Sequence, residues 1–133
     1  MTTLQEKIRQ ELVVSEDLVY QEMITKVKTM IKLDSKGNTF FVGDQNKYTQ
    51  QDQILLLLIG RWFAYRAGLT ENDCVELEEM QKMIAASEKT VRARLAELTK
   101  KRMISREERG RYRIEYASMS DTLSNLERKS TKQ

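Results

Sequence analysis

Residues 76–116 have the sequence ELEEMQKMIAASEKTVRARLAELTKKRMISREERGRYRIEY, and the predicted fold depends chiefly on them. It contains, in order, a short amphipathic segment, the turn Ala85-Ala86, a basic amphipathic segment, and a basic segment in which apolar and charged residues alternate. This order predicts two helices joined by a tight turn and followed by a β-hairpin.

The second helix is predicted over residues 87–100. Ser87 is a suitable N-cap because its hydroxyl can accept a hydrogen bond from a backbone N–H of the first turn. Val91, Leu95 and Leu98 recur at i, i+4 and i+7, which predicts one apolar stripe. The side opposite the stripe carries Lys89, Ala93, Ala96 and Lys100, with Arg92 and Arg94 on its flanks. Small alanines would let the backbone approach base edges in a major groove about 12 Å wide, and the cations could reach phosphates or purines.

The flanking elements have their own signals. The first helix is predicted from Glu76 to about Ile84, and it begins with acidic residues, which the helix dipole favours. After the second helix, a strand beginning at Met103-Ile104, a turn over 107–110 and a return strand over 111–116 predict the hairpin.

Positive charge is concentrated in this region. Residues 87–113 contain ten Lys/Arg and four Asp/Glu, a net charge of +6, whereas residues 71–86 have a net charge of −4. The whole chain carries only +3, so the basic character is local. A local basic surface on a helix that fits a groove indicates nucleic-acid binding.

The sequence resembles the winged helix-turn-helix superfamily of prokaryotic and archaeal DNA-binding regulators. The resemblance rests on the stretch SEKTVRARLAELTKKRMISREERGRYRI and covers in all about a third of the chain. In that family the second helix contacts the major groove and the wing contacts the DNA backbone or minor groove. The resemblance implies DNA contacts from a recognition helix at 87–100 and a wing at 105–113. The implied residues are Ser87, Lys89, Thr90, Arg92, Ala93, Arg94 and Lys100 on the helix, and Arg106, Arg109 and Arg111 on the wing. Ala85-Ala86 departs from the family pattern, because many members have a glycine in this turn.

Two other interpretations stay open. The basic helix face could be an ordinary solvated surface, with Arg92 and Arg94 serving as ion-pair partners of Glu88 and Glu97. A winged helix could also act as a protein–protein interaction or scaffold module that never contacts DNA.

The sequence offers little for catalysis. It has no histidine, a single cysteine (Cys74), and five glycines too scattered for a phosphate-binding loop. We therefore expect no enzyme activity, no cofactor and no metal site. The charged start MTTLQEKIRQEL and the absence of a long apolar run predict neither a signal peptide nor a membrane span, and hence a cytoplasmic, nucleoid-associated protein.

The remaining segments predict a core and its extensions. Thr49 with Asp52, and Gly68 beyond the far end, bound a buried helix of roughly eighteen residues, within which Gly60 indicates the close approach of another backbone. Turn residues within 30–43 predict a second hairpin. A C-terminal helix is predicted over 118–128, with Ser118 and Asp121 as a capping pair.

The N-terminal helices have more apolar surface than a small domain can cover. Leu4, Ile8 and Leu12 form one stripe, and Ser15 can cap a second helix with its own stripe. The surplus predicts a homodimer through the N-terminal and C-terminal helices; the alternative is that these helices fold back on the core.

The sequence thus predicts a mainly α-helical α+β fold, a winged helix-turn-helix with small β-hairpins. Its predicted regions are a dimerising segment (1–46) of helices and a hairpin, the winged helix (47–117), and a short C-terminal helix with a disordered tail (118–133). The predicted function is double-stranded DNA binding by a transcriptional regulator.

Overall fold

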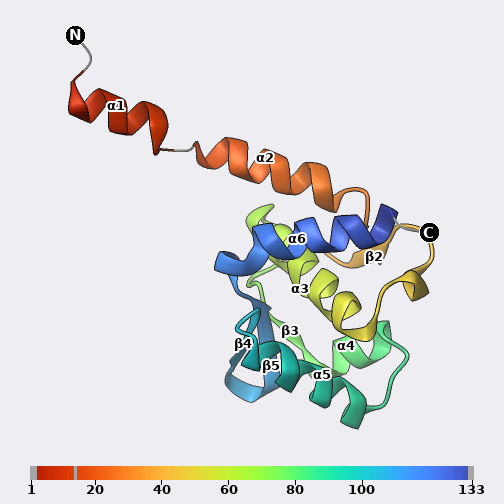
Figure 1. Cartoon of the computed structure of the whole chain (residues 1–133). Helices are drawn as coiled ribbons and strands as arrows, with labels where there is room; N and C mark the ends of the chain where they lie inside the picture. The colour runs from red at the N-terminus through yellow and green to blue at the C-terminus, as the bar shows by residue number, and fades with distance from the viewer. Residues whose placement is uncertain (1–2, 14, 132–133) are drawn as a thin grey trace.

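A computed structural model describes residues 3–13 and 15–131 and shows a mixed α and β fold (Figure 1). The helices are α1 (Leu4–Glu11), α2 (Glu16–Val27), α3 (Gln50–Arg66), α4 (Leu77–Met83), α5 (Glu88–Lys100) and α6 (Tyr116–Thr131), with short 3-10 turns η1 (Gln45–Lys47) and η2 (Glu108–Gly110). The strands are β1 (Ile31–Leu33), β2 (Thr39–Phe41), β3 (Val75–Glu76), β4 (Ile104–Glu107) and β5 (Arg111–Ile114). They form two small antiparallel sheets, β1-β2 and β3-β5-β4.

Helix α3 is the centre of the core, as predicted. It begins after Thr49, whose hydroxyl accepts from the Asp52 N–H at 3.1 Å. It ends in a Schellman motif: Gly68 adopts a left-handed φ of 77°, its N–H donates to the Tyr65 carbonyl, and the next N–H donates to the Ala64 carbonyl. Every residue from 52 to 60 is buried, so the helix is covered on all sides in its first half.

The predicted first hairpin is confirmed and sits on α3 at Gly60. A Cβ atom at Gly60 would lie 2.3 Å from Oγ1 and 2.9 Å from Cγ2 of Thr39, which belongs to β2. The prediction of a close neighbour is therefore correct, but the neighbour is a side chain and not a backbone. The missing Cβ makes a notch in α3 that receives Thr39.

Helix α5 packs against both α3 and α4, and the three-stranded sheet packs against all three helices. The Ser87 hydroxyl accepts from the Thr90 N–H at 3.2 Å and begins α5 as predicted. The hairpin β4–β5 is also confirmed, with Ile104 opposite Ile114 and Glu107 opposite Arg111. Strand β3 was not predicted; its two residues pair with β5 and place Glu76 before α4, not within it.

The C-terminal helix differs from its prediction at both ends. The return strand stops at Ile114, so α6 begins at Tyr116. Ser118 lies inside the first turn, and its hydroxyl donates to the carbonyls of Glu115 and Met103, so it does not cap the helix. The predicted disordered tail is wrong for 129–131, because the helix continues through Thr131 and the Lys129 ammonium pairs with Asp52 at 2.8 Å. Residues 132–133 lie outside the described residues.

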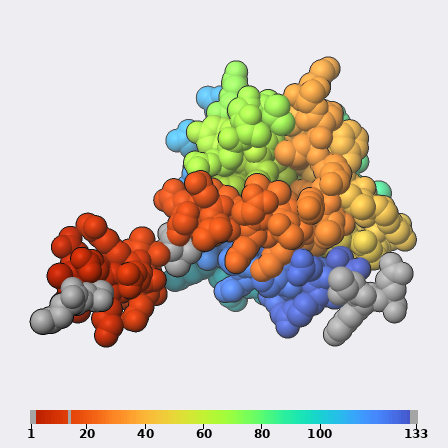
Figure 2. All heavy atoms as spheres, turned by 90° about the horizontal axis from the view of Figure 1, so that it is seen from above, coloured from red at the N-terminus to blue at the C-terminus, as the bar shows by residue number. Residues whose placement is uncertain are grey.

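The two N-terminal helices behave differently. Helix α2 begins after Ser15, which forms no side-chain cap bond, and it buries Met23 and Val27 in the same cluster as α3 and α6. None of the residues of α1, all of which are described, is buried, although a complete capping box at Thr3 begins the helix. Helix α1 projects away from the rest of the chain (Figures 1 and 2).

Candidate nucleic-acid interface

The two sides of α5 have different tasks. Val91, Leu95 and Leu98 are buried against the core, as the stripe predicted. The four predicted outward residues, Lys89, Ala93, Ala96 and Lys100, are all exposed. The core therefore fixes the axis of α5 and leaves one complete side of the helix available to a partner.

The two lysines on this side are not engaged by the chain itself. Among the described residues, neither Lys89 nor Lys100 has a hydrogen bond or ion pair. Arg92 pairs with Glu88 one turn earlier, at 2.8 Å, and both side chains are more than half exposed. Such exposed pairs are weak, so Arg92 can exchange this partner for another anion.

Arg94 is placed differently from the other cations of α5. Its Nη1 lies 2.6 Å from the Glu97 carboxylate, and its Nε donates to the Gln50 side chain of α3 at 3.4 Å. Glu97 in turn accepts a hydrogen bond from Gln51. The bonds from Arg94 and Gln51 hold the pKa of Glu97 below its ordinary value. This cluster ties α5 to the first turn of α3, so Arg94 has a structural partner whichever ligand the surface binds.

The start of α5 combines two hydroxyl groups. The Ser87 hydroxyl donates to Thr90 Oγ1 at 2.9 Å, while its oxygen accepts from the Thr90 backbone. Both predicted contact residues thus take part in the helix cap. The remaining hydrogen-bonding capacity of Thr90 Oγ1 is what a partner could use.

The hairpin β4–β5 adds cations beside α5. Arg106 and Arg109 are exposed, and Arg109 occupies the turn with a left-handed φ of 63°. Arg111 is half-buried, with its Nε 3.4 Å from the Glu108 carbonyl. Arg113, which was not predicted as a contact, pairs with Glu107 across the hairpin at 3.1 Å.

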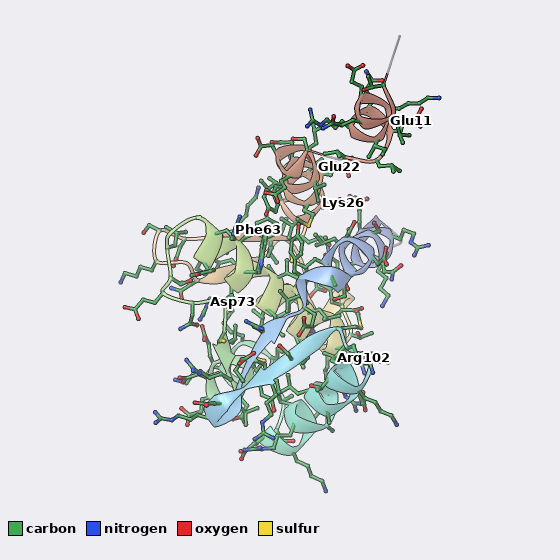
Figure 3. All side chains as sticks on the ribbon, turned by 90° about the vertical axis from the view of Figure 1, so that its left-hand side faces the viewer. Glu11, Glu22, Lys26, Phe63, Asp73 and Arg102 are labelled. Atoms are coloured by element: carbon green, nitrogen blue, oxygen red, sulfur yellow. The ribbon has the colours of Figure 1, made fainter. Side chains whose placement is uncertain are left out.

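Two further cations at the end of α5 were absent from the predicted set. Lys101 and Arg102 are exposed and continue the basic surface from the helix into β4. Figure 3 shows Arg102 at this end of α5, far from Glu11 of α1. Arg102 adopts a φ of 60°, and the N–H groups of Arg102 and Met103 donate to Thr99 and Leu98 in a second Schellman motif. The basic run Lys100-Lys101-Arg102 is the feature of the sequence that could have identified these two cations.

The turn between α4 and α5 forms without glycine. Ile84 ends α4 in an extended conformation, and none of residues 84–86 has a positive φ. The side chain of Gln45 supports the turn from outside, since its Nε2 donates to the Met83 carbonyl at 2.7 Å. The Ala85-Ala86 connection is therefore tight although it contains no glycine.

The part of the chain that the structure describes contains neither a metal-binding cluster nor a membrane-spanning helix. No cluster of three His, Cys, Asp or Glu side chains there could hold a metal ion. Every helix described is too short or too polar to cross a bilayer.

Comparison of the chain with protein-family models, with curated proteins and with solved structures found no match. The assignment of function therefore rests on the geometry and charge of the α5 surface.

Proposed function

We propose that residues 47–117 form a winged helix-turn-helix domain that binds double-stranded DNA, and that the protein regulates transcription from the cytoplasm. The observation that carries the proposal is the outward side of α5, where Lys89 and Lys100 flank two alanines and form no hydrogen bond or ion pair within the described chain. The order α3, β3, α4, α5, β4, β5 supports it, because this succession places a basic hairpin immediately after the helix.

In the proposed complex, α5 enters the major groove. Ala93 and Ala96 let the helix backbone approach the bases, and Lys89 and Arg92 reach base edges or phosphates. Arg106 and Arg109 on the hairpin neutralise phosphates beside the groove. The buried stripe and the Arg94–Glu97 cluster keep α5 fixed during binding, so little ordering of this helix is needed.

The direct test is the affinity for a mixed-sequence DNA duplex measured at increasing salt concentration. About six phosphate contacts would give a slope of log K against log salt of about −5. A flat response would contradict DNA binding and would favour the alternative, a protein-interaction module.

We also propose that two copies associate through α1. Leu4 and Leu12 are 75% and 73% exposed, and Ile8 on the same side is also exposed. An isolated helix of eight residues is marginal in water, so α1 needs a covering surface. A second copy supplies the same apolar stripe, which is the symmetric arrangement that most homo-oligomers use.

The test is the molecular mass in solution by sedimentation equilibrium. The variant Leu4→Ser/Leu12→Ser should be monomeric, whereas Gln5→Ser/Gln10→Ser, on the same exposed helix, should remain dimeric. A wild-type protein that is monomeric at high concentration would exclude the dimer.

A further inference from the structure

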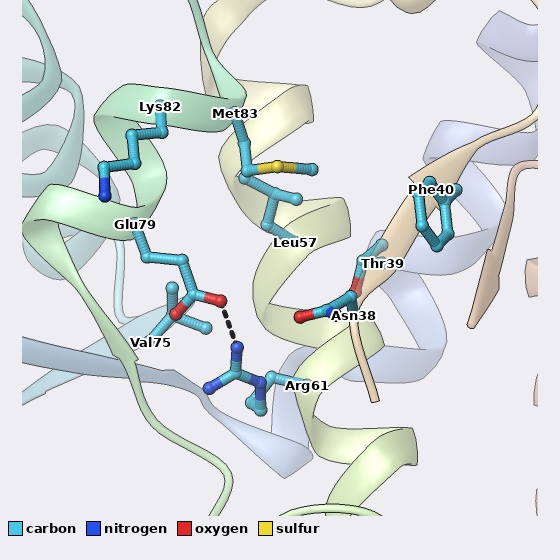
Figure 4. A pocket seen from close by; sticks show the side chains of 9 residues that line it. All are labelled: Asn38, Thr39, Phe40, Leu57, Arg61, Val75, Glu79, Lys82 and Met83. Atoms are coloured by element: carbon cyan, nitrogen blue, oxygen red, sulfur yellow. Dashed lines mark hydrogen bonds and ion pairs between the residues drawn. The ribbon is translucent and has the colours of Figure 1, made fainter. Parts of the chain in front are cut away.

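A cavity of about 300 Å³ lies between the first hairpin, α3 and α4. Figure 4 shows the side chains that line it: Asn38, Thr39, Phe40, Leu57, Arg61, Val75, Glu79, Lys82 and Met83. Most of its surface is apolar, with a few polar groups. This composition is typical of small-molecule sites, and the volume is at the lower end of their range. The DNA-binding proposal makes no use of it.

The guanidinium of Arg61 is the unusual group in this cavity. The side chain is only 17% exposed. Its Nη1 donates to the Cys74 carbonyl at 2.9 Å, and its Nη2 pairs with Glu79. Its Nε is buried and has no hydrogen-bond partner among the described residues. A buried donor without an acceptor is unfavourable, and the described chain provides no acceptor for this nitrogen. A ligand could provide one.

The geometry of the Arg61–Glu79 pair indicates which acceptor fits. The edge formed by Nε and Nη2 can bind both oxygens of a carboxylate, but Glu79 engages only Nη2. Glu79 is 39% exposed, so its carboxylate can move into solvent when another takes its place. A ligand carboxylate on this edge would satisfy both nitrogens.

The opposite wall offers an acceptor. The Asn38 side chain is held by Asp34, which accepts from its Nδ2 at 3.0 Å. Its amide oxygen is left to face the cavity (Figure 4). Leu57, Val75 and Met83 supply apolar surface to the same cavity.

We infer that this cavity binds a small monocarboxylate with an apolar body, whose carboxylate replaces Glu79 on Arg61. A hydrogen-bond donor on the ligand would reach the Asn38 oxygen. Helix α4 carries Glu79 and Met83 and packs on α5, so the ligand acts on the element that supports the recognition helix. Binding of the ligand should therefore change the affinity for DNA. That effect rests on the proposed function, whereas the binding of the ligand to the cavity does not.

The test uses 3-phenylpropanoate as the probe and 3-phenylpropanamide as its neutral counterpart, with the methionine methyl groups followed by NMR in the absence of DNA. The Met83 methyl resonance should shift saturably with the carboxylate at millimolar concentration. The buried Met119 methyl, in α6, should not shift. The amide should bind at least about tenfold more weakly, because it carries no charge for Arg61.

Variants at two neighbouring glutamates test whether Glu79 competes with the ligand carboxylate for Arg61. Glu79→Gln removes the competing charge and should tighten binding several-fold. Glu78→Gln makes the same change one residue away, on an exposed side chain, and should leave the affinity unchanged. Arg61→Lys, which keeps the charge but loses the two-nitrogen edge, should weaken binding at least about tenfold.

Failure of the probe to shift Met83, or weaker binding by Glu79→Gln than by Glu78→Gln, would overturn the inference. Loss of DNA binding alone would not, because the shift is measured on the protein without DNA. Conversely, normal DNA affinity with no response to the probe would leave the proposed function intact and remove only the ligand site.

Discussion

Helices α5 and α6 bury similar apolar stripes in the core but face different surroundings. Each buries three apolar side chains at helical spacing: Val91, Leu95 and Leu98 in α5, and Met119, Leu123 and Leu126 in α6. Helix α6 is covered in turn by α2, where the Lys26 ammonium donates to the Ser124 hydroxyl at 2.9 Å. No described element covers the outward side of α5.

The comparison of α5 with α6 shows that core packing does not require the lysines on the outward side of α5. Both helices bury the same number of apolar side chains, so the core does not need two lysines on the outside of α5. In α6 the cation Lys129 is bound by Asp52, while in α5 the ammonium groups of Lys89 and Lys100 face solvent. This unengaged charge is what a polyanionic partner would use.

The largest expected effect is on the free energy of unfolding, when a buried leucine of α5 or of α6 is shortened. Leu95→Ala and Leu123→Ala should each lower the free energy of unfolding by about 2–5 kcal/mol, because each leaves a cavity where a fully buried side chain stood. Urea denaturation followed by circular dichroism measures both. A loss at Leu123 far smaller than at Leu95 would mean that α6 is not an equal part of the core.

The outward side of α5 should matter for DNA and not for stability. Lys89→Ala/Lys100→Ala should weaken duplex binding by about tenfold or more and reduce the salt slope by about two. The matched control is Lys28→Ala/Lys32→Ala, which removes the same charge from exposed positions outside the proposed interface. Equal losses in the two double variants would show that only net charge matters, and the assigned face would then be wrong.

A smaller effect is expected where α3 and α5 end. Both helices close with a Schellman motif, but Gly68 occupies the left-handed position after α3 and Arg102 occupies it after α5. Arg102→Gly should stabilise the fold by about 1 kcal/mol, because a residue with a Cβ disfavours this conformation. Gly68→Ala should destabilise it by a similar amount.

The same variant also tests the interface. If Arg102 contacts DNA, Arg102→Gly should raise the thermal midpoint while lowering duplex affinity. An increase in both quantities would remove Arg102 from the basic surface. Left-handed arginines stand at both ends of β4, at Arg102 and Arg109, where glycine would be less strained.

The smallest effect concerns pH. The pKa of Glu97 is lowered by its bonds from Arg94 and Gln51, so the ionised form stabilises the fold. This contribution is present above the pKa of Glu97 in the unfolded chain and is lost as the pH falls through its lower pKa in the folded chain. Glu97→Gln should therefore flatten the acid side of the stability profile, measured as thermal midpoint against pH. An unchanged acid slope would show that the cluster with Gln51 is not formed in solution.

Features fixed by neighbours in the sequence could be predicted. The cap at Thr49, the glycine after α3 and the stripe of α5 depend on residues within one or two turns, so periodicity and capping rules located them. The hairpin β4–β5 was equally local, because its strands are joined by a short turn.

Features fixed by distant contacts could not be predicted. Strand β3 has only two residues, and its pairing with β5 joins positions 75 and 112. The last turn of α6 is polar, and its Lys129 pairs with Asp52 across 77 positions. Arg94 looked equivalent to Arg92 in sequence, yet Gln50, 44 positions away, turns it toward α3. The cavity has no sequence signature either, since its walls come from residues spread over 38–83.

The notch at Gly60 links the central helix to the dimensions of the cavity. Thr39 fills the notch in α3 and also lines the cavity. The absence of a Cβ atom at Gly60 therefore sets how closely the hairpin approaches α3. A methyl group at position 60 would push this wall outward, and the opening between Asn38 and Arg61 would widen. If the cavity binds the proposed carboxylate, the size of that ligand therefore depends on Gly60, a residue that the ligand would not contact.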